Sequence, residues 1–114
     1  MSIRIKVANT AKELDDVFKL RHEVYIQERG KYSSDKSDSL RIVDHFDTMP
    51  DVANIVAYEG SKAIATMRVN KDSQIGLPAE KYFDFSGALS QIKSTYRNSN
   101  GREPNIVSGS MLAI

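Results

Sequence analysis

Residues 10–29 read TAKELDDVFKLRHEVYIQER, and this stretch decides the fold. Its apolar side chains recur at helical spacing and so fall on one face of a helix; they are Leu14, Val17, Phe18, Val24 and Tyr25. Thr10 and Glu13 have the spacing of a capping box, which satisfies backbone donors at a helix start, and Gly30 follows as a stop. The stretch is therefore predicted to be an amphipathic helix packed on a core.

Two charged residues, Arg21 and Glu28, interrupt the apolar face of this helix. A guanidinium on the buried side of a helix is costly to desolvate unless a carboxylate or a bound anion compensates it. A short run further along the chain supplies two carboxylates, Asp44 and Asp47, and a later strand-like run supplies a second arginine, Arg68. These charges are the chemical centre of the predicted site.

Strands are predicted on both sides of this helix. Residues 3–7 alternate apolar and polar, which predicts a half-buried strand whose core-facing residues are Ile3, Ile5 and Val7. Two apolar runs, 53–59 and 62–70, flank Gly60-Ser61, a pair typical of a two-residue hairpin turn. Alternation along the second run places three residues on one face of the sheet: Ile64, Thr66 and Arg68.

The other segments are a loop, a second helix and a last strand. Residues 31–40 hold too few apolar side chains to bury much surface, so we expect a polar, mobile loop there. A helix is predicted from a cap at Asp84 or Ser86 to about Arg97, followed by a turn over 98–101. Residues 106–114 read as a strand. Because a domain seldom ends on an apolar strand, we expect the sequence to be truncated inside its fourth strand.

Composition narrows the classes of function. The 114 residues allow a single domain, and a net charge of +1 with interspersed signs lacks the basic excess of a nucleic-acid binder. The absence of cysteine excludes disulfides and a thiol nucleophile, and two histidines do not suggest a metal site. The sequence has neither a signal core nor a run of transmembrane length. We expect a cytoplasmic protein with no metal, no nucleic-acid partner and no stable membrane insertion.

The order of these elements is that of the N-terminal half of the GNAT-type acyltransferase fold, an α/β (α+β) architecture with a mostly antiparallel sheet flanked by helices. A narrower set of residues, in order, resembles the acyl-homoserine-lactone (autoinducer) synthases and the long-chain N-acyl amino acid synthases: Arg21, Val24-Tyr25, Glu28-Arg29-Gly30, Asp44, Asp47, Arg68 and residues 76–80. Autoinducer synthases usually carry a glutamate at the position of Ile42. The resemblance therefore favours the N-acyl amino acid synthase branch.

The resemblance implies an N-acyltransferase that moves a fatty acyl group from acyl carrier protein or acyl-CoA to an amino acid amine, without a bound cofactor. It assigns catalytic roles to Asp44, Asp47 and Glu28. It assigns substrate binding to four further residues: Arg21, Tyr25, Phe46 and Arg68. In GNAT folds a basic, glycine-containing loop after the fourth strand holds the pantetheine arm of the donor. Since the sequence ends before such a loop, we expect residues 1–114 to form a partial domain that is inactive alone and associates through its final strand.

Other interpretations stay open from the sequence. An acyl-homoserine-lactone synthase would also bind S-adenosylmethionine, and a non-catalytic half-domain would only bind an acyl carrier protein or a partner chain. Arg21 is equally explained by a structural salt bridge to Asp44 or Asp47, and the D-x-x-D pair by a turn or cap. Tyr25 and Phe46 fit a core or an acyl channel better than catalysis.

Overall fold

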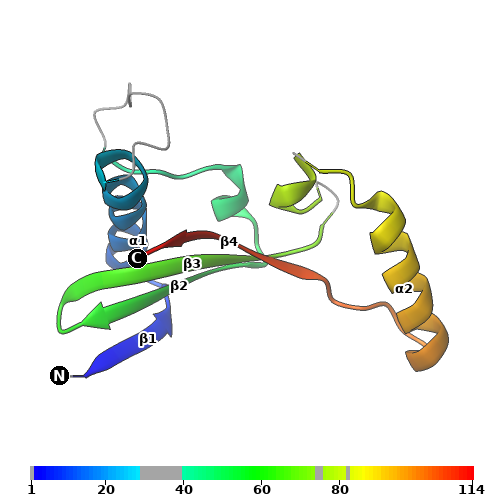
Figure 1. Ribbon diagram of the computed structural model, residues 1–114. Helices are drawn as coiled ribbons and strands as arrows, with labels where there is room; N and C mark the ends of the chain where they lie inside the picture. The colour runs from blue at the N-terminus through cyan, green and yellow to red at the C-terminus, as the bar shows by residue number, and fades with distance from the viewer. Residues whose placement is uncertain (1, 29–39, 74–75, 82) are drawn as a thin grey trace.

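The computed structural model contains one four-stranded antiparallel sheet, in the order β1-β2-β3-β4, with α1 against one of its faces (Figure 1). The structure describes residues 2–28, 40–73, 76–81 and 83–114. The helical elements are α1 (Ala11–His22), π-helical η1 (Glu23–Glu28), 3-10 helices η2 (His45–Thr48) and η3 (Pro78–Lys81), and α2 (Ser86–Asn100). The strands are β1 (Ile3–Val7), β2 (Val52–Glu59), β3 (Lys62–Lys71) and β4 (Val107–Ala113). The predicted fold class is confirmed.

The helix start is as predicted, with one change in its cap. The Thr10 side chain accepts a hydrogen bond from the Glu13 amide at 3.1 Å, and the Glu13 carboxylate accepts one from the amide of Asn9, rather than Thr10, at 3.1 Å. α1 gives way to η1 at Glu23 without leaving the helical path. The predicted stop at Gly30, and residues 31–39 of the predicted loop, lie outside the described residues.

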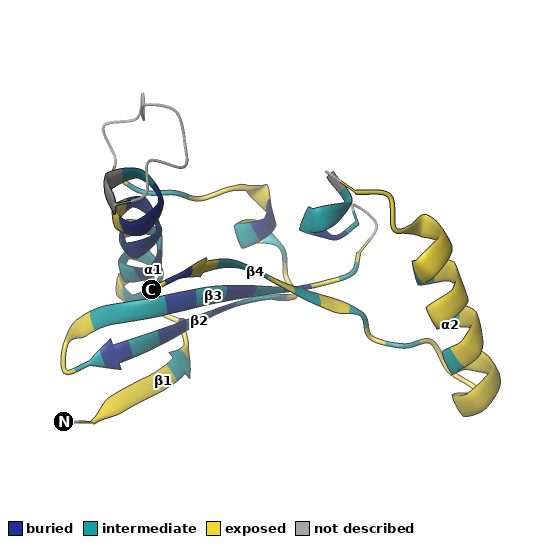
Figure 2. Cartoon of the chain, viewed as in Figure 1, coloured by how far each residue is buried: buried dark blue, intermediate teal, exposed yellow. Residues whose placement is uncertain are grey.

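The core lies between α1 and the sheet, where Figure 2 shows the buried residues gathered. One cluster holds Ala8, Val17, Val56 and Tyr58, with Val17 and Val56 fully buried. A second cluster joins the end of the helix to the last strand and holds Leu20, Val24, Tyr25 and Ala113. Val17, Val24 and Tyr25 of the predicted apolar face are buried, and Leu14 and Phe18 pack against the first cluster.

The prediction for the faces of the first strand is wrong. Three residues expected in the core are exposed: Ile3, Ile5 and Val7. The face toward α1 belongs instead to Arg4, whose guanidinium lies 5.3 Å from the centre of the Tyr58 ring, and to Lys6, whose Nζ lies 2.6 Å from a Glu13 carboxylate oxygen. Alternation reveals that a strand has two kinds of face, but the placement of α1 decides which face is covered.

The β2–β3 hairpin forms as predicted, with Gly60 in the turn at a φ of 62°. Its register shifts after Ala57, so that Tyr58 lies opposite Ala63. Ala63 therefore packs against the core. Beyond the shift the prediction holds, because two residues that follow it, Thr66 and Arg68, are each only 2% exposed.

The second helix and the last strand lie at the margin of the molecule. α2 runs three residues beyond the predicted Arg97 and ends at Gly101, whose φ of 70° is the left-handed conformation of a helix cap. No residue of α2 is buried, and the helix stands apart from the sheet (Figures 1 and 2). β4 occupies one edge of the sheet, and association through it stays a prediction. Within the described ranges, no helix is long and apolar enough to cross a membrane.

Candidate functional site

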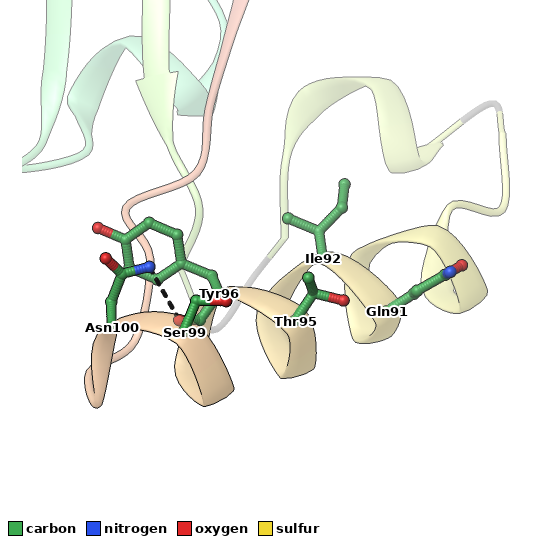
Figure 3. A pocket seen from close by; sticks show the side chains of 6 residues that line it. All are labelled: Gln91, Ile92, Thr95, Tyr96, Ser99 and Asn100. Atoms are coloured by element: carbon green, nitrogen blue, oxygen red, sulfur yellow. Dashed lines mark hydrogen bonds between the residues drawn. The ribbon is translucent and has the colours of Figure 1, made fainter.

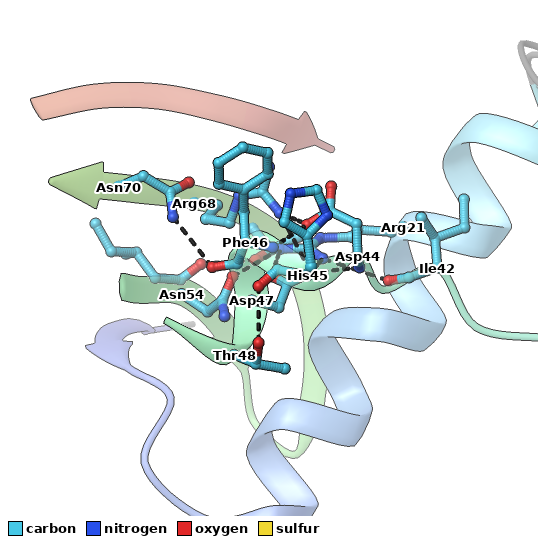
Figure 4. A network of polar contacts seen from close by, with 12 residues as sticks. Arg21, Ile42, Asp44, His45, Phe46, Asp47, Thr48, Asn54, Arg68 and Asn70 are labelled. Carbon is cyan, nitrogen blue, oxygen red and sulfur yellow. Dashed lines mark hydrogen bonds and ion pairs between the residues drawn. The ribbon is translucent and has the colours of Figure 1, made fainter. Parts of the chain in front are cut away.

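Two arginines and two aspartates meet where α1, β3 and η2 come together (Figure 4). Arg21 Nη1 and Nη2 donate to the two carboxylate oxygens of Asp47 at 2.9 and 3.0 Å, a two-pronged ion pair. Nη2 also donates to Asn54 Oδ1 at 2.6 Å, and Nη1 to the Ile42 carbonyl at 3.3 Å. The two charged side chains are 0% and 1% exposed. Asp47 is therefore the carboxylate that compensates the buried charge of Arg21.

The second arginine faces the other aspartate. Arg68 Nη1 lies 2.6 Å from Asp44 Oδ1 and 3.3 Å from Asp47 Oδ2, so that Asp47 contacts both arginines. Arg68 is buried, whereas the Asp44 side chain is 41% exposed. The network thus runs from the interior, at Arg21, to the surface, at Asp44.

The aspartate pair also caps η2. The Asp44 carboxylate accepts a hydrogen bond from the Phe46 amide at 2.9 Å, while Asp47 Oδ2 accepts one from the Asp44 amide at 3.0 Å. The two interpretations of the D-x-x-D spacing are therefore compatible, because the same carboxylates cap a short helix and compensate two arginines.

Charge compensation controls the pKa of Asp47. Burial alone would raise the pKa of this carboxyl, but hydrogen bonds from Arg21 and the Asp44 amide, together with the charges of Arg21 and Arg68, hold it below its usual value. Asp47 is therefore a fixed anion at neutral pH, and it sets the orientation of both guanidinium groups.

A cavity of about 410 Å³ opens beside Arg68 and Asp44. Apolar residues form much of its wall, and Phe46 lies with its ring centre 5.7 Å from the Arg68 guanidinium. The lining residues come from the segment around η2, from β3, from η3 with the residues after it, and from β4; they are Ile42, Asp44, Phe46, Arg68, Pro78, Ala79, Phe83, Ser108, Gly109, Ser110 and Met111. An anionic side chain, a cationic side chain and an apolar surface therefore share one cavity.

Comparison with known families agrees with this arrangement. The family model described as N-acyl amino acid synthase FeeM matches residues 16–114, which include the whole network and the cavity. The chain belongs to the FeeM family. The predicted N-acyl amino acid synthase branch of the GNAT-like group is thereby confirmed. No curated protein matches the chain.

A solved structure of FeeM, described as an N-acyl amino acid synthase from uncultured soil microbes, has the same fold with a TM-score of 0.68. The match covers 99% of this chain at 15% identity. It covers 52% of the FeeM chain, so the present sequence spans about half the length of that protein. At this identity the likeness concerns the fold alone.

The FeeM-family fold brings some of the predicted site residues together and leaves others apart. Asp44, Phe46 and Arg68 line the cavity. Arg21 and Asp47 lie behind them, buried in the network. Tyr25 is 6% exposed, and its hydroxyl donates to the Leu112 carbonyl, which ties η1 to β4. The side chain of the remaining predicted residue, Glu28, lies outside the described part of the chain. The functional roles assigned to all these residues stay predictions.

Two polar residues of the cavity wall in this FeeM-family chain, Ser108 and Ser110, were not predicted as site residues from the sequence. The only available signal was their spacing around Gly109 in the last strand, which places both on one face. Asn54, a further partner of the Arg21 guanidinium, was likewise not predicted. An asparagine inside an apolar strand pattern marks a polar contact without naming its partner.

A second hollow, on α2, is chemically different (Figure 3). Its lining comes from one helix, without an acidic or basic side chain: Gln91, Ile92, Thr95, Tyr96, Ser99 and Asn100. Asn100 Nδ2 donates to the Tyr96 carbonyl at 3.0 Å, so this amide already has a partner. Across the described ranges, no group of three or more His, Cys, Asp or Glu side chains is placed to hold a metal ion. The cavity beside Arg68 is therefore the candidate site.

Proposed function

We propose that this chain carries the acceptor-binding part of an N-acyl amino acid synthase. The proposed reaction transfers a fatty acyl group from the thioester of acyl carrier protein or coenzyme A to the amine of an amino acid. The observation that supports it is the pairing, in one cavity, of the Asp44–Arg68 ion pair with an apolar wall. A zwitterionic acceptor and an acyl chain need these two kinds of surface side by side.

In the proposed reaction the amine nitrogen attacks the carbonyl carbon of the thioester. A C–N bond forms, the C–S bond breaks, and the thiol leaves. The ammonium group of the acceptor loses two protons, of which one goes to the departing thiolate and the other to Asp44. Since the Asp44 side chain is 41% exposed, it can pass that proton on to solvent.

Asp47 has a different proposed role. Its side chain is 1% exposed and occupied by Arg21, by Arg68 and by the Asp44 amide. It is therefore a positioning residue, which holds Arg68 and Asp44 at the cavity without contacting the substrate. The catalytic role of Glu28 stays a prediction.

The apolar wall is proposed to receive the start of the acyl chain. Ile42, Phe46, Phe83 and Met111 offer that surface on several sides of the cavity. Alignment of the amine with the thioester accounts for a large share of acyl-transfer catalysis, because it converts a bimolecular encounter into a reaction between neighbours. A covalent enzyme intermediate is not required.

The test is product formation, followed by mass spectrometry. The chain alone, and the chain continued after Ile114 by the part of FeeM beyond the matched half, are each incubated with acyl-CoA or acyl carrier protein thioesters and the twenty amino acids. We expect N-acyl amino acids from the joined chain and no steady turnover from the chain alone. Asp44→Asn in the joined chain removes the proposed proton acceptor and should lower the rate.

Thermal unfolding checks that the joined chain is folded. A folded joined chain that yields no N-acyl amino acid from either thioester contradicts the proposed function. Steady product from the 114-residue chain alone would instead refute the predicted inactivity of this part, while supporting the reaction. The two thioesters, compared at equal concentration, identify the donor.

A further inference from the structure

A bulge in β4 lies beside the cavity. In the β3–β4 pairing Ser110 lies opposite Arg68, but Thr66, the next residue of β3 on the same face, lies opposite Ala113. A regular antiparallel pairing would place residue 112 opposite Thr66. Two residues of β4 therefore occupy the place of one, and the alternation of side chains along the strand is shifted there.

Met111 is the bulged residue that lines the cavity. In a regular strand its side chain would point to the face opposite that of Ser110, because neighbouring side chains alternate. Instead both residues line the cavity, while Leu112 is 54% exposed. Met111 has a φ of 54°, in the left-handed region where the Cβ of an L residue is crowded. The bulge therefore directs the methionine side chain into the cavity.

Contacts between β4 and η1 hold the bulge in place. The hydroxyl of Tyr25 donates to the carbonyl of Leu112. Ala113, which follows, is 1% exposed and belongs to the same buried cluster as Tyr25 and Val24. A residue other than glycine keeps a left-handed conformation only where its surroundings determine it, and such residues gather at functional sites. The conformation of Met111 therefore points to a role in the cavity.

Met111 lies on the inner side of this cavity. Phe83, which also lines it, is 64% exposed and marks the open side. Met111 and Ile42 line the cavity and at the same time pack against the buried cluster between η1 and β4. These two side chains therefore separate the cavity from the core. A methionine side chain is unbranched and flexible, so its position decides how deep the cavity is.

We propose that Met111 sets the length of the acyl chain that the cavity accepts. This inference rests on the proposed function and adds a specificity-determining residue to it. An acyl chain that enters past Phe83 runs along the apolar wall and ends against the Met111 side chain. Each methylene buried before that point should strengthen binding by about fourfold, whereas further methylenes find no apolar surface to cover them.

Binding of saturated fatty acids to the 114-residue chain tests this independently of acyl transfer. Titration calorimetry compares the series from hexanoic to tetradecanoic acid, each below its critical micelle concentration. We expect the affinity of the parent to rise with length and then to stop rising at a limiting length. In Met111→Gly and Met111→Ala the limit should move about two carbons further. The acid two carbons beyond the limit of the parent should bind these variants at least about tenfold more tightly than the parent.

Two variants control for changes in the fold. Leu112→Ala shortens the neighbouring, exposed side chain of the same bulge and should keep the limiting length of the parent. Met111→Leu keeps an apolar side chain of similar size and should keep it as well. If Met111→Ala does not fold, Met111→Asn replaces it, because asparagine is short and tolerates a left-handed backbone.

Urea unfolding checks the backbone conformation in the same variants. Glycine adopts a positive φ without steric cost, whereas in an ordinary strand it is less stable than alanine. Met111→Gly should therefore unfold at a higher urea concentration than Met111→Ala. The opposite order would show that residue 111 is not left-handed in solution and would overturn the inference.

The inference also fails if the shortened variants keep the limiting length of the parent, or if the parent binds none of the acids. It fails if the affinity of the parent rises through the whole series, or if Leu112→Ala moves the limit equally. A limit that moves as expected, without N-acyl amino acids from the joined chain, would refute the proposed function and leave Met111 as the end of an apolar cavity. N-acyl products with the same chain-length preference in the joined parent and in its Met111→Gly variant would do the reverse.

Discussion

The two arginine–aspartate pairs of this chain use the same chemistry in opposite surroundings. Arg21 and Asp47 are closed off from water, and Asn54 and the Ile42 carbonyl take further hydrogen bonds of the guanidinium. Arg68 instead lies at a cavity and pairs with an aspartate that is 41% exposed, while Nε of both arginines lacks a partner among the described residues. A pair with most of its hydrogen bonds satisfied inside the protein fixes structure, whereas a pair that lies at a cavity and is partly exposed can bind a ligand.

The largest expected effect comes from the pair of Arg21 and Asp47, which we call the closed pair. Arg21→Met keeps the bulk of the side chain but leaves Asp47 buried without its main partner, which should lower the free energy of unfolding by about 3–5 kcal/mol. The matched control is Arg41→Met, which removes a half-exposed ion pair with Asp15 and should cost less than about 1 kcal/mol. Urea unfolding measures both, and a loss below 1 kcal/mol for Arg21→Met would show that the pairs do not differ as described.

Changes in the pair of Arg68 and Asp44, which we call the open pair, should impair ligand binding more than stability. Asp44→Asn keeps the size of the side chain and leaves Arg68 its contact with Asp47, so the stability cost should stay near 1 kcal/mol. Amino acid binding should fall about tenfold, which corresponds to about 1.4 kcal/mol. Arg68→Ala is a less specific variant, since Arg68 is buried and its removal would leave Asp44 unpaired and take one of its two arginines from Asp47. Parent-like binding by Asp44→Asn, measured by calorimetry, would remove Asp44 from the site.

Acid should weaken the closed pair, but only at a pH below the ordinary range for an aspartate. Because the pKa of Asp47 is lowered in the folded protein, its contribution to stability is present above the ordinary aspartate pKa of about 3.9 and is lost as the pH falls through the lower folded value. The stability gap between the parent and Asp47→Asn should therefore narrow between about pH 5 and about pH 2. Chemical unfolding at several pH values measures this, and a gap that does not change with pH would argue against the lowered pKa.

Asp15→Asn shows how added salt affects the stability contribution of a less buried carboxylate than Asp47. A hydrogen bond from Arg41 lowers the pKa of this half-exposed carboxyl to about 2. Added salt should reduce its contribution, because exposed charges are screened, and should affect the Asp47 contribution much less.

The smallest effect is expected on the other face of the sheet. Ile5 is 69% exposed and takes no part in the core, so Ile5→Lys should change the free energy of unfolding by no more than about 0.5 kcal/mol. Urea unfolding measures this change. A loss above 2 kcal/mol would mean that the face of β1 that carries Ile5 is covered in solution.

The sequence by itself determined the elements and the identity of the charges. Helical spacing placed Arg21 on a buried face and so required a carboxylate partner, and the capping residues and the Gly60-Ser61 turn located the helix start and the hairpin. These signals are local, since they depend on backbone geometry within a few residues. The ordered set that includes Arg21, Asp44, Asp47 and Arg68 indicated the wider group, and Ile42 favoured the N-acyl amino acid synthase branch.

The tertiary structure alone decided which aspartate pairs with which arginine, which face of β1 is covered, and that Ser110 lies opposite Arg68. Arg21 and Asp47 are 26 residues apart, and Arg68 is 42 residues from Ser110 along the chain. Such contacts depend on strand register and on where α1 packs, neither of which local periodicity encodes. The position of Met111 became visible only when the sheet brought β4 to a cavity formed by segments distant in sequence.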